Sequence, residues 1–191
     1  MELRNICKAY QGRPVLQNLS CVFSPGVTVL RGPSGAGKTT LLRILMGLER
    51  PDSGELVGTD LRWSAVFQED RLLEGLDAFG NLRFALGADF DVPKAAAMLK
   101  ALRLADTGSK PVRDWSGGMK RRLALARALL AVSDAIALDE PFTGLDGENR
   151  RRAAACILRA AAEKPVLLVT HDPVEPDIRP AAVVELSVRS I

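Results

Sequence analysis

The sequence has few of the residues that carry metal or disulfide chemistry. Of its 191 residues, three are cysteines and one is a histidine. Cys7, Cys21 and Cys156 are far apart in the chain, with no C-x-x-C pair and no histidine beside them. We therefore expect reduced thiols in a reducing compartment rather than a disulfide framework or a zinc site.

Strong charge and long apolar runs are also missing. The formal net charge is +3, which is too small to favour a nucleic-acid surface. The longest apolar-rich stretch, Leu123–Val132, is interrupted by Arg127, and no run reaches the ~20 apolar residues of a membrane-spanning helix. Met1–Ile6 lacks the apolar segment of a signal peptide. We expect a protein that is soluble by itself, binds no nucleic acid and reaches a membrane only through a partner.

What the sequence does contain is an alternation of strand and helix patterns. Its 47% apolar content is enough for a buried core in a single domain spanning residues 1–191. The segment before Ser24 is β-rich, with alternating apolar and polar residues. Together these patterns predict an α/β fold with a mostly parallel sheet. The expected strands cover 27–31, 55–57, 64–67, 135–138, 165–169 and 183–186, and the expected helices 40–46, 78–86, 94–102, 118–131 and 147–162.

The segment Gly32–Thr39 fits the pattern G-x-x-x-x-G-K-[ST] between a predicted strand and a predicted helix. Such a loop turns several backbone N–H groups toward phosphate oxygens, and the helix N-terminus adds its partial positive charge. Lys38 would reach the β- and γ-phosphates, and the Thr39 hydroxyl would ligate Mg²⁺. The alternative is a glycine-rich turn with a chance lysine. The predicted nucleotide contacts are Gly32, Pro33, Ser34, Gly35, Ala36, Gly37, Lys38, Thr39 and Thr40.

Two carboxylates, Asp139 and Glu140, follow an apolar predicted strand. Asp139 would support the magnesium ion through water, and Glu140 would polarise the water that attacks the γ-phosphate. The alternative is a strand-terminal turn with acidic residues before Pro141.

His171 and Gln68 each follow another predicted strand, where catalytic loops of α/β sheets are found. His171 could hydrogen-bond the γ-phosphate and position the water, and Gln68 could contact both magnesium and water. The alternatives are that His171 has only a structural role and that Gln68 is a plain polar loop residue.

Ser116–Lys120, with the sequence Ser-Gly-Gly-Met-Lys, begins a predicted helix. Ser116 can cap the helix, and Gly117 and Gly118 leave backbone N–H groups exposed as a second anion site. Lys120–Arg122 place positive charge at the N-terminal end of the helix, where the helix dipole is already positive. A bound phosphate would explain this arrangement. The alternative is a capped helix with a solvated basic face, which is our interpretation of the run Arg150–Arg152.

In this order, the segments from Tyr10 to Pro173 resemble an ATP-binding cassette (ABC) ATPase. The resemblance implies ATP and Mg²⁺ as cofactors and a RecA-like P-loop NTPase core. It also implies an N-terminal antiparallel β subdomain and a short helical subdomain at 72–131, with 1–71 and 132–191 forming the β and catalytic core. The family's elements then fall on Gly32–Thr39 (Walker A), Gln68 (Q-loop), Ser116–Met119 (signature), Asp139 and Glu140 (Walker B), Gly144–Asp146 (D-loop) and His171 (switch histidine).

The resemblance further implies a head-to-tail dimer with a second ATPase subunit. Each ATP would lie between one P-loop and the partner's signature, so Ser116, Gly117, Gly118 and Asp146 would act on the opposite nucleotide. Tyr10 would lie against adenine, with a strand core residue as the alternative.

Finer similarity is to ATPase subunits of bacterial importers for nitrate, sulfonates and taurine. It implies partner permease subunits, a solute-binding protein and a place on the cytoplasmic face of the membrane. The segments that carry it are Val66–Leu73, Ser116–Lys120, Leu138–Phe142 and Val169–Asp172.

The chain also departs from the family pattern. Trp115 stands where leucine is usual, the stretch between Gln68 and Ser116 is short, and the chain ends too soon after His171 for a C-terminal regulatory domain. The alternatives to a transporter subunit are a non-transport ABC ATPase and a regulatory module that binds ATP.

Overall fold

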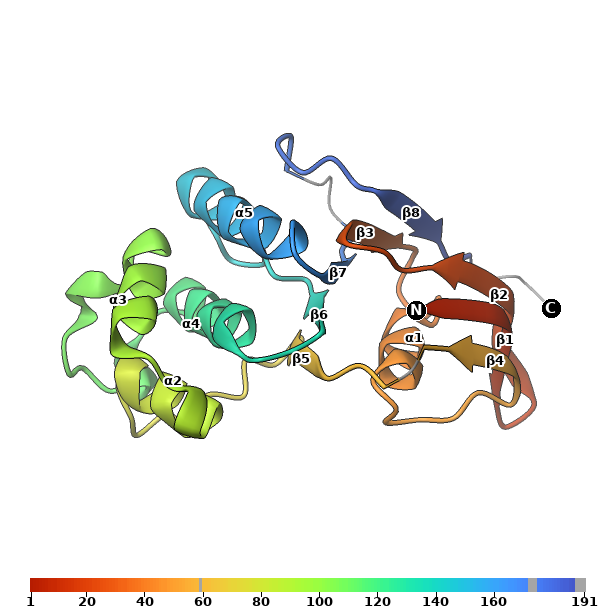
Figure 1. Cartoon of the computed structure of the whole chain (residues 1–191), viewed down its shortest axis with the longest axis horizontal. Helices are drawn as coiled ribbons and strands as arrows, with labels where there is room; N and C mark the ends of the chain where they lie inside the picture. The colour runs from red at the N-terminus through yellow and green to blue at the C-terminus, as the bar shows by residue number, and fades with distance from the viewer. Residues whose placement is uncertain (59, 172–174, 188–191) are drawn as a thin grey trace.

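The computed structural model describes residues 1–58, 60–171 and 175–187 (Figure 1). Asp172 and Pro173, which belong to the resemblance above, lie outside them. Within the described residues, the chain forms two sheets with helices packed between and beside them. The mixed α/β fold with a parallel sheet is confirmed.

The smaller sheet is antiparallel and comes from the N-terminal part of the chain. Its strand order is β2-β1-β4. The β1–β2 hairpin turns at Gln11–Gly12, and Tyr10 pairs with Arg13 beside this turn. The three strands are β1 (Glu2–Tyr10), β2 (Arg13–Val22) and β4 (Ser53–Val57).

The larger sheet has the strand order β5-β6-β7-β3-β8, and all its strand pairs are parallel. Parallel strands need crossover connections, which the helices supply. The strands are β3 (Gly26–Arg31), β5 (Trp63–Val66), β6 (Ala135–Asp139), β7 (Pro165–Val169) and β8 (Ala182–Glu185).

Five α-helices accompany the sheets, and four of them begin at a residue whose side chain accepts a backbone hydrogen bond. Asp77, Asp91, Ser116 and Asp146 cap α2, α3, α4 and α5 in this way. The helices are α1 (Lys38–Leu45), α2 (Ala78–Leu86), α3 (Val92–Ala101), α4 (Gly117–Leu130) and α5 (Gly147–Ala161), with short 3₁₀ turns at Gly87–Asp89, Ala105–Thr107 and Val112–Asp114.

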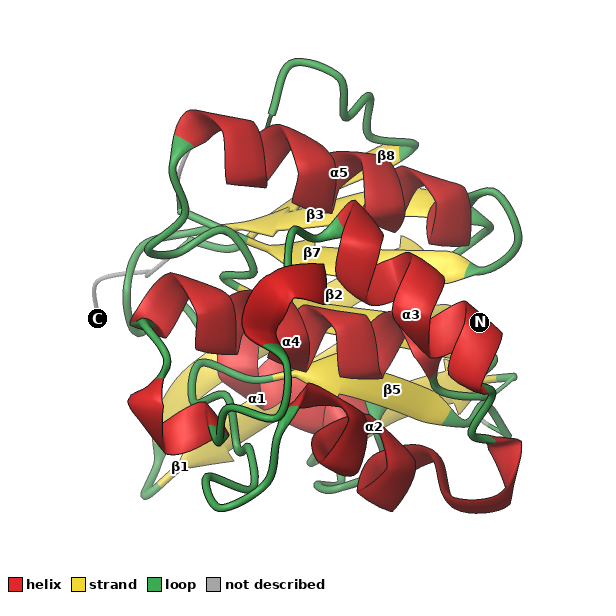
Figure 2. Cartoon of the chain, turned by 90° about the vertical axis from the view of Figure 1, so that its left-hand side faces the viewer, coloured by secondary structure: helices red, strands yellow, loops and turns green. Residues whose placement is uncertain are grey.

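The parallel sheet separates two hydrophobic clusters. Ile136 and Leu138 of β6 pack into one cluster with α2–α5, whereas Ala137 packs into the other with α1 and the small sheet. Figure 2 shows α3, α4 and α5 in front of the strands, with α1 behind them. Since both faces are covered, both sets of alternating side chains are apolar, which explains the continuous apolar runs in the sequence.

Most predicted elements are present with shifted ends. The helix predicted at 40–46 begins at Lys38, because the P-loop passes directly into α1. The helix predicted at 94–102 begins at Val92, after the Asp91 cap. The division at residues 72 and 131 stays a prediction; α4, inside the predicted helical part, packs on α2 and α3 and also on β5 and α5.

The topology brings four loops to one edge of the parallel sheet. The P-loop follows β3, Gln68 follows β5, Asp139 ends β6, and His171 follows β7. These strands are neighbours, so their carboxyl ends lie side by side, which is where ligands bind in open α/β sheets. Among the residues that the structure describes, no helix is both long and apolar enough to cross a membrane.

Candidate active site

A cleft of about 660 Å³ opens at this edge of the sheet. Its volume lies within the usual range of small-molecule sites. Residues from both sheets and from the P-loop line it, so the cleft exists only because the chain folds these segments together. The lining residues are Tyr10, Val15, Ser34, Gly35, Gly37, Lys38, Thr39, Thr40, Gln68, Asp139, Glu140 and His171.

The P-loop forms one wall of the cleft. Lys38 Nζ donates to the carbonyl oxygens of Gly32 at 2.7 Å and Pro33 at 2.8 Å, so its ammonium lies across the loop. Gly37 has φ +92°, and a Cβ there would lie 2.7 Å from Val15 Cγ1. Glycine is therefore required at this position, both by the backbone angle and by the close approach of β2.

Three of the predicted P-loop contacts, Gly32, Pro33 and Ala36, are not among the residues that line the cleft. Ala36 shows why. Its side chain is buried in the cluster beneath α1, and its N–H donates to Pro33 O at 3.2 Å. The side chain of Ala36 therefore does not face the cleft, and its prediction as a contact holds at most for its backbone.

The carboxylates at the end of β6 have different surroundings. Burial, followed by the nearby Glu140 charge, raises the pKa of the Asp139 carboxyl above its usual value, against the opposing effect of Arg121 and Lys38. The Glu140 side chain instead reaches His171: its Oε1 lies 2.7 Å from His171 Nδ1 and accepts from the His171 backbone N–H at 3.0 Å. Two of the three predicted catalytic residues, Glu140 and His171, are thus in direct contact, and the third, Gln68, lines the same cleft.

Thr39, Gln68 and Asp139 bring three oxygen donors to the cleft: a hydroxyl, an amide carbonyl and a carboxylate. Mg²⁺ prefers oxygen ligands and binds proteins through one or two side chains together with phosphates. The donor set fits the magnesium ion predicted for these residues.

Tyr10 lies at the mouth of the cleft. The residue is 42% exposed, and its hydroxyl donates to Glu49 Oε1 at 2.6 Å. The alternative that Tyr10 is a strand core residue is therefore wrong, because its position at the end of β1 turns it out of the core. An exposed ring beside the P-loop is suited to stacking on a planar base.

The predicted signature and D-loop residues do not line this cleft. Ser116, Gly117, Gly118 and Asp146 lie together elsewhere: a Cβ on Gly118 would be 2.9 Å from Gly144 O. Ser116 and Gly117 are exposed at the start of α4, where the Ser116 hydroxyl accepts from Met119 N at 3.3 Å. The structure therefore places these residues next to one another but not next to the P-loop of the same chain.

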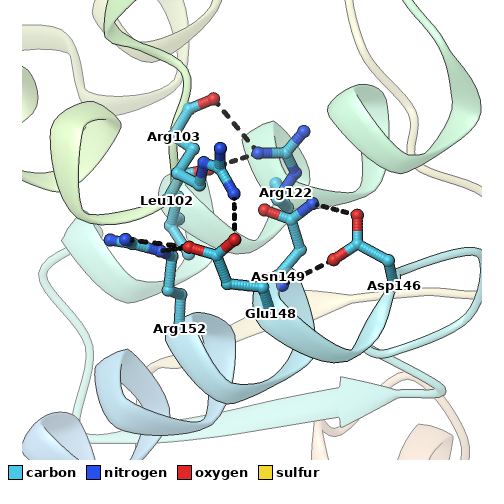
Figure 3. A network of polar contacts seen from close by, with 7 residues as sticks. All are labelled: Leu102, Arg103, Arg122, Asp146, Glu148, Asn149 and Arg152. Atoms are coloured by element: carbon cyan, nitrogen blue, oxygen red, sulfur yellow. Dashed lines mark hydrogen bonds and ion pairs between the residues drawn. The ribbon is translucent and has the colours of Figure 1, made fainter.

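A polar network ties this second surface to the helical part of the fold (Figure 3). Asp146 accepts from the backbone N–H of Asn149 at 2.9 Å and from its side-chain amide at 2.8 Å. Glu148 contacts Arg103 at 2.5 Å and Arg152 at 3.1 Å. The start of α5 is thus linked to the end of α3.

The basic residues Lys120–Arg122 do not form the phosphate-facing cluster that the sequence suggested. Lys120 pairs with Glu74 at 3.0 Å. Arg121 and Arg122 are buried, and both donate to backbone carbonyls; Arg122 Nη1 reaches Leu102 O at 2.6 Å. The solvated face is wrong for Arg121 and Arg122, although Ser116 does cap the helix as the same alternative has it. Hydrogen bonds to backbone carbonyls compensate for the cost of burying the two guanidinium groups. The bound phosphate stays a prediction.

The run Arg150–Arg152 is mostly the solvated face that we expected. Arg151 and Arg152 are exposed, whereas Arg150 is half-buried, with an ion pair to Glu175 at 2.9 Å.

Sequence reasoning missed Val15 and the contacts that Arg121 makes. Val15 lies in the cleft opposite the P-loop, and Arg121 donates to carbonyls at the ends of β5 and β6. The turn at Gln11–Gly12 could have placed Val15 near Tyr10. Nothing in the local pattern signals the partners of Arg121, which are 51 or more positions distant on the β5 side.

Comparison with known proteins agrees with this geometry. Residues 16–143 match the family described as ABC transporter. The chain is 39% identical over 189 residues to the aliphatic sulfonates import ATP-binding protein SsuB 1 of Xanthomonas axonopodis pv. citri, covering 90% of this chain and 75% of that protein. It is 35% identical over 189 residues to the taurine import ATP-binding protein TauB of Pseudomonas fluorescens, covering 90% and 72%.

The fold is also shared with solved structures. A solved structure described as the ATP-binding subunit of an ABC transporter superposes with a TM-score of 0.85 at 23% identity, over 99% of this chain and 88% of that one. The matched family segment spans the P-loop, the signature and the Asp139–Glu140 pair. The chain therefore belongs to the ABC transporter family, as an ATP-binding domain with ATPase activity.

Proposed function

We propose that the chain is the energising subunit of an importer for a small solute of the sulfonate or taurine class. It would bind ATP with Mg²⁺ at the cytoplasmic face of the membrane and drive solute uptake through a permease. The observation that carries the enzymatic part is the convergence of Lys38, Gln68, Asp139, Glu140 and His171 on one cleft.

Each of these side chains has a distinct task in the proposed reaction. Lys38, held across the P-loop by carbonyls of Gly32 and Pro33, would exchange those partners for phosphate oxygens. Thr39, Gln68 and Asp139 would hold Mg²⁺, which when bound would neutralise developing phosphate charge. Glu140 would accept the proton of the attacking water. His171, whose Nδ1 lies 2.7 Å from Glu140 Oε1, would hydrogen-bond the γ-phosphate and help to position this water.

The separation of two groups of site residues supports the proposed dimer. Ser116–Gly118 and Asp146 lie together on a surface away from the cleft. Exposed backbone N–H groups at a helix start suit a phosphate that a second chain presents. We propose that a second ATPase subunit, a copy or a close relative, completes each site.

The solute class rests on the relatives alone, because the chain's own site residues face a nucleotide and not the cargo. A non-transport ABC ATPase or a regulatory ATP-binding module is the alternative. The presence of Lys38, Glu140 and His171 in one cleft favours an active ATPase over a regulatory module.

The enzymatic part is tested with two substitutions. Lys38→Ala should abolish ATP binding in an equilibrium titration, because it removes the cation of the P-loop. Glu140→Gln should keep ATP binding and lower phosphate release by about 10²–10⁴-fold, the usual contribution of a general base. Arg151→Gln, on the exposed face of α5, is the matched control and should change neither quantity. Equal hydrolysis by wild type and Glu140→Gln would contradict the assignment of the base.

The transport part is tested with a permease that co-purifies with this chain from membranes. In liposomes with that permease, a taurine or alkanesulfonate load carried by the solute-binding protein should stimulate ATP hydrolysis and uptake together, and Glu140→Gln should abolish both. Hydrolysis without any response to the permease would leave an ATPase that does not energise transport.

A further inference from the structure

Arg121 is a buried cation that the proposed reaction does not use. It lies in the second turn of α4 and is 4% exposed. A buried guanidinium is costly unless nearly every donor finds an acceptor. The oxygen atoms that accept hydrogen bonds from Arg121, and so compensate for its burial, lie at the active-site edge of the parallel sheet.

The guanidinium group spans the ends of two neighbouring strands. On the β6 side, Nη2 donates to Glu140 O at 2.8 Å and also to Asp139 O, and Nε donates to Glu140 O at 3.2 Å. On the β5 side, Nη1 donates to Phe67 O at 2.6 Å and contacts Asp70 Oδ1 at 2.9 Å. One planar group therefore clamps the backbone that carries Glu140 to the backbone that carries Gln68.

The Glu140 backbone shows why such a clamp matters. Its φ is +50°, a left-handed conformation that costs a non-glycine residue free energy and persists only where its surroundings enforce it. Its N–H donates to Val169 O at 2.9 Å, and its carbonyl accepts from Arg121. The Thr143 N–H also donates to the Glu140 carbonyl, at 3.2 Å. Arg121 thus supplies one of the contacts that hold the Glu140 backbone in the conformation that aims its side chain into the cleft.

On the opposite side, the loop after Gln68 is held by α4 as well. Arg127 Nη2 donates to Asp70 O at 2.8 Å, and Arg127 Nη1 donates to Arg71 O at 2.7 Å. Arg127 contacts this loop but donates to neither strand end, so it provides a matched comparison within the same helix.

We propose that Arg121 is a positioning residue that fixes the distance between Gln68 and Glu140 and links it to the position of α4. Gly117, Gly118 and Arg121 lie in the first two turns of α4, and Ser116 caps this helix. A displacement of the α4 N-terminus by a ligand or partner shifts the guanidinium, and with it the base and the magnesium ligand. The inference rests on the proposed ATPase function and assigns Arg121 no contact with ATP.

The test compares Arg121→Lys with Arg127→Lys in the full chain. Lysine keeps the charge but has one nitrogen, which cannot bridge two strand ends. We expect Arg121→Lys to lower kcat for ATP hydrolysis at least about tenfold, while the Kd for ATP changes less than about twofold. Arg127→Lys should keep kcat within about twofold of wild type. All variants are assayed well below their melting temperatures.

A double-mutant cycle separates positioning from general damage. In the Glu140→Gln background, Arg121→Lys should lower the residual rate much less than it lowers the wild-type rate, because the base that Arg121 positions is already gone and only its effect through Gln68 remains. Asp70→Asn, which keeps Arg121 but weakens one of its partners, should give a smaller loss of kcat in the same direction.

Several outcomes would overturn the inference: additive losses in the cycle, a fall in ATP affinity that matches the fall in kcat, or equal losses for Arg121→Lys and Arg127→Lys. If Glu140→Gln hydrolyses ATP as fast as wild type, the proposed base is wrong. A tenfold loss in Arg121→Lys with a normal effect of Glu140→Gln supports both proposals separately.

Discussion

At the scale of single residues, Asp139 and Glu140 show how adjacent carboxylates can do different work. Asp139 is half-buried at the end of β6, and its raised pKa means that its charge costs stability. Glu140, also half-buried, turns toward the cleft and His171 through a left-handed backbone. A desolvated carboxylate suits a cation, whereas one beside a histidine suits a proton transfer.

Asp139→Asn should raise thermal stability at neutral pH and abolish Mg²⁺-dependent hydrolysis. A carboxyl whose pKa is raised in the folded state loses stability as pH rises from its unfolded value of about 4 through the folded value. Asparagine does not titrate, so the stability gained over wild type should appear across that window and stay constant above it. Thermal melts from about pH 4 to pH 7 measure this. A variant less stable than wild type at pH 7 would contradict the conclusion that burial of the charged Asp139 carboxylate lowers stability.

At the scale of elements, the P-loop depends on the β-hairpin that packs against it. Gly37 ends the loop and begins α1, with its Cα facing Val15 and Leu16 of β2. The same hairpin presents Tyr10 to the cleft. The antiparallel sheet is therefore part of the nucleotide site.

Gly37→Ala should destabilise the chain and weaken ATP binding together. Its Cβ would lie 2.7 Å from Val15 Cγ1 and 2.9 Å from Leu16 Cδ2, at a backbone angle of +92°. We expect a loss of about 1–3 kcal/mol in the free energy of unfolding, measured in urea. Gly35→Ala is the control for steric effects, because it also has a positive φ but no atom within 4 Å of its Cβ. Equal losses in both variants would show that backbone strain, not contact with β2, decides the effect.

At the scale of the whole molecule, the chain presents its site residues as two separate sets. The cleft holds the P-loop with Glu140 and His171, whereas Ser116–Gly118 and Asp146 form another surface tied to α3 through Arg103 and Glu148. We propose that the two sets meet between chains, in the head-to-tail arrangement described above.

Mixing two inactive variants should restore activity. Lys38→Ala keeps the signature surface, and Ser116→Arg keeps the P-loop, so a mixed dimer has one complete site. At equal concentrations, about half of the dimers are mixed and one of their two sites works, which gives about a quarter of wild-type hydrolysis. Light scattering should show a dimer with ATP and a monomer without it. No recovery on mixing would exclude a homodimer as the active form.

Much of the site could be predicted because its signals are local. Gly32–Thr39, the pair Asp139–Glu140, and His171 are short patterns at the ends of apolar strands, and the parallel sheet brings strand ends to one edge. Helix caps such as Asp91 were missed, so α3 begins two residues before its predicted start. Boundaries depend on single capping contacts that apolar periodicity does not report.

The sequence by itself determined which chemical groups this protein has and the order in which strands and helices follow. These depend on residue types and on periodicity along the chain, which are local properties. Only the tertiary structure decided that Tyr10 is exposed, that Arg121 and Arg122 are buried among carbonyls, and that Ser116 lies away from the P-loop of its own chain. Burial and partners depend on segments far apart in sequence, so packing alone decides whether a basic residue binds a ligand or supports the fold.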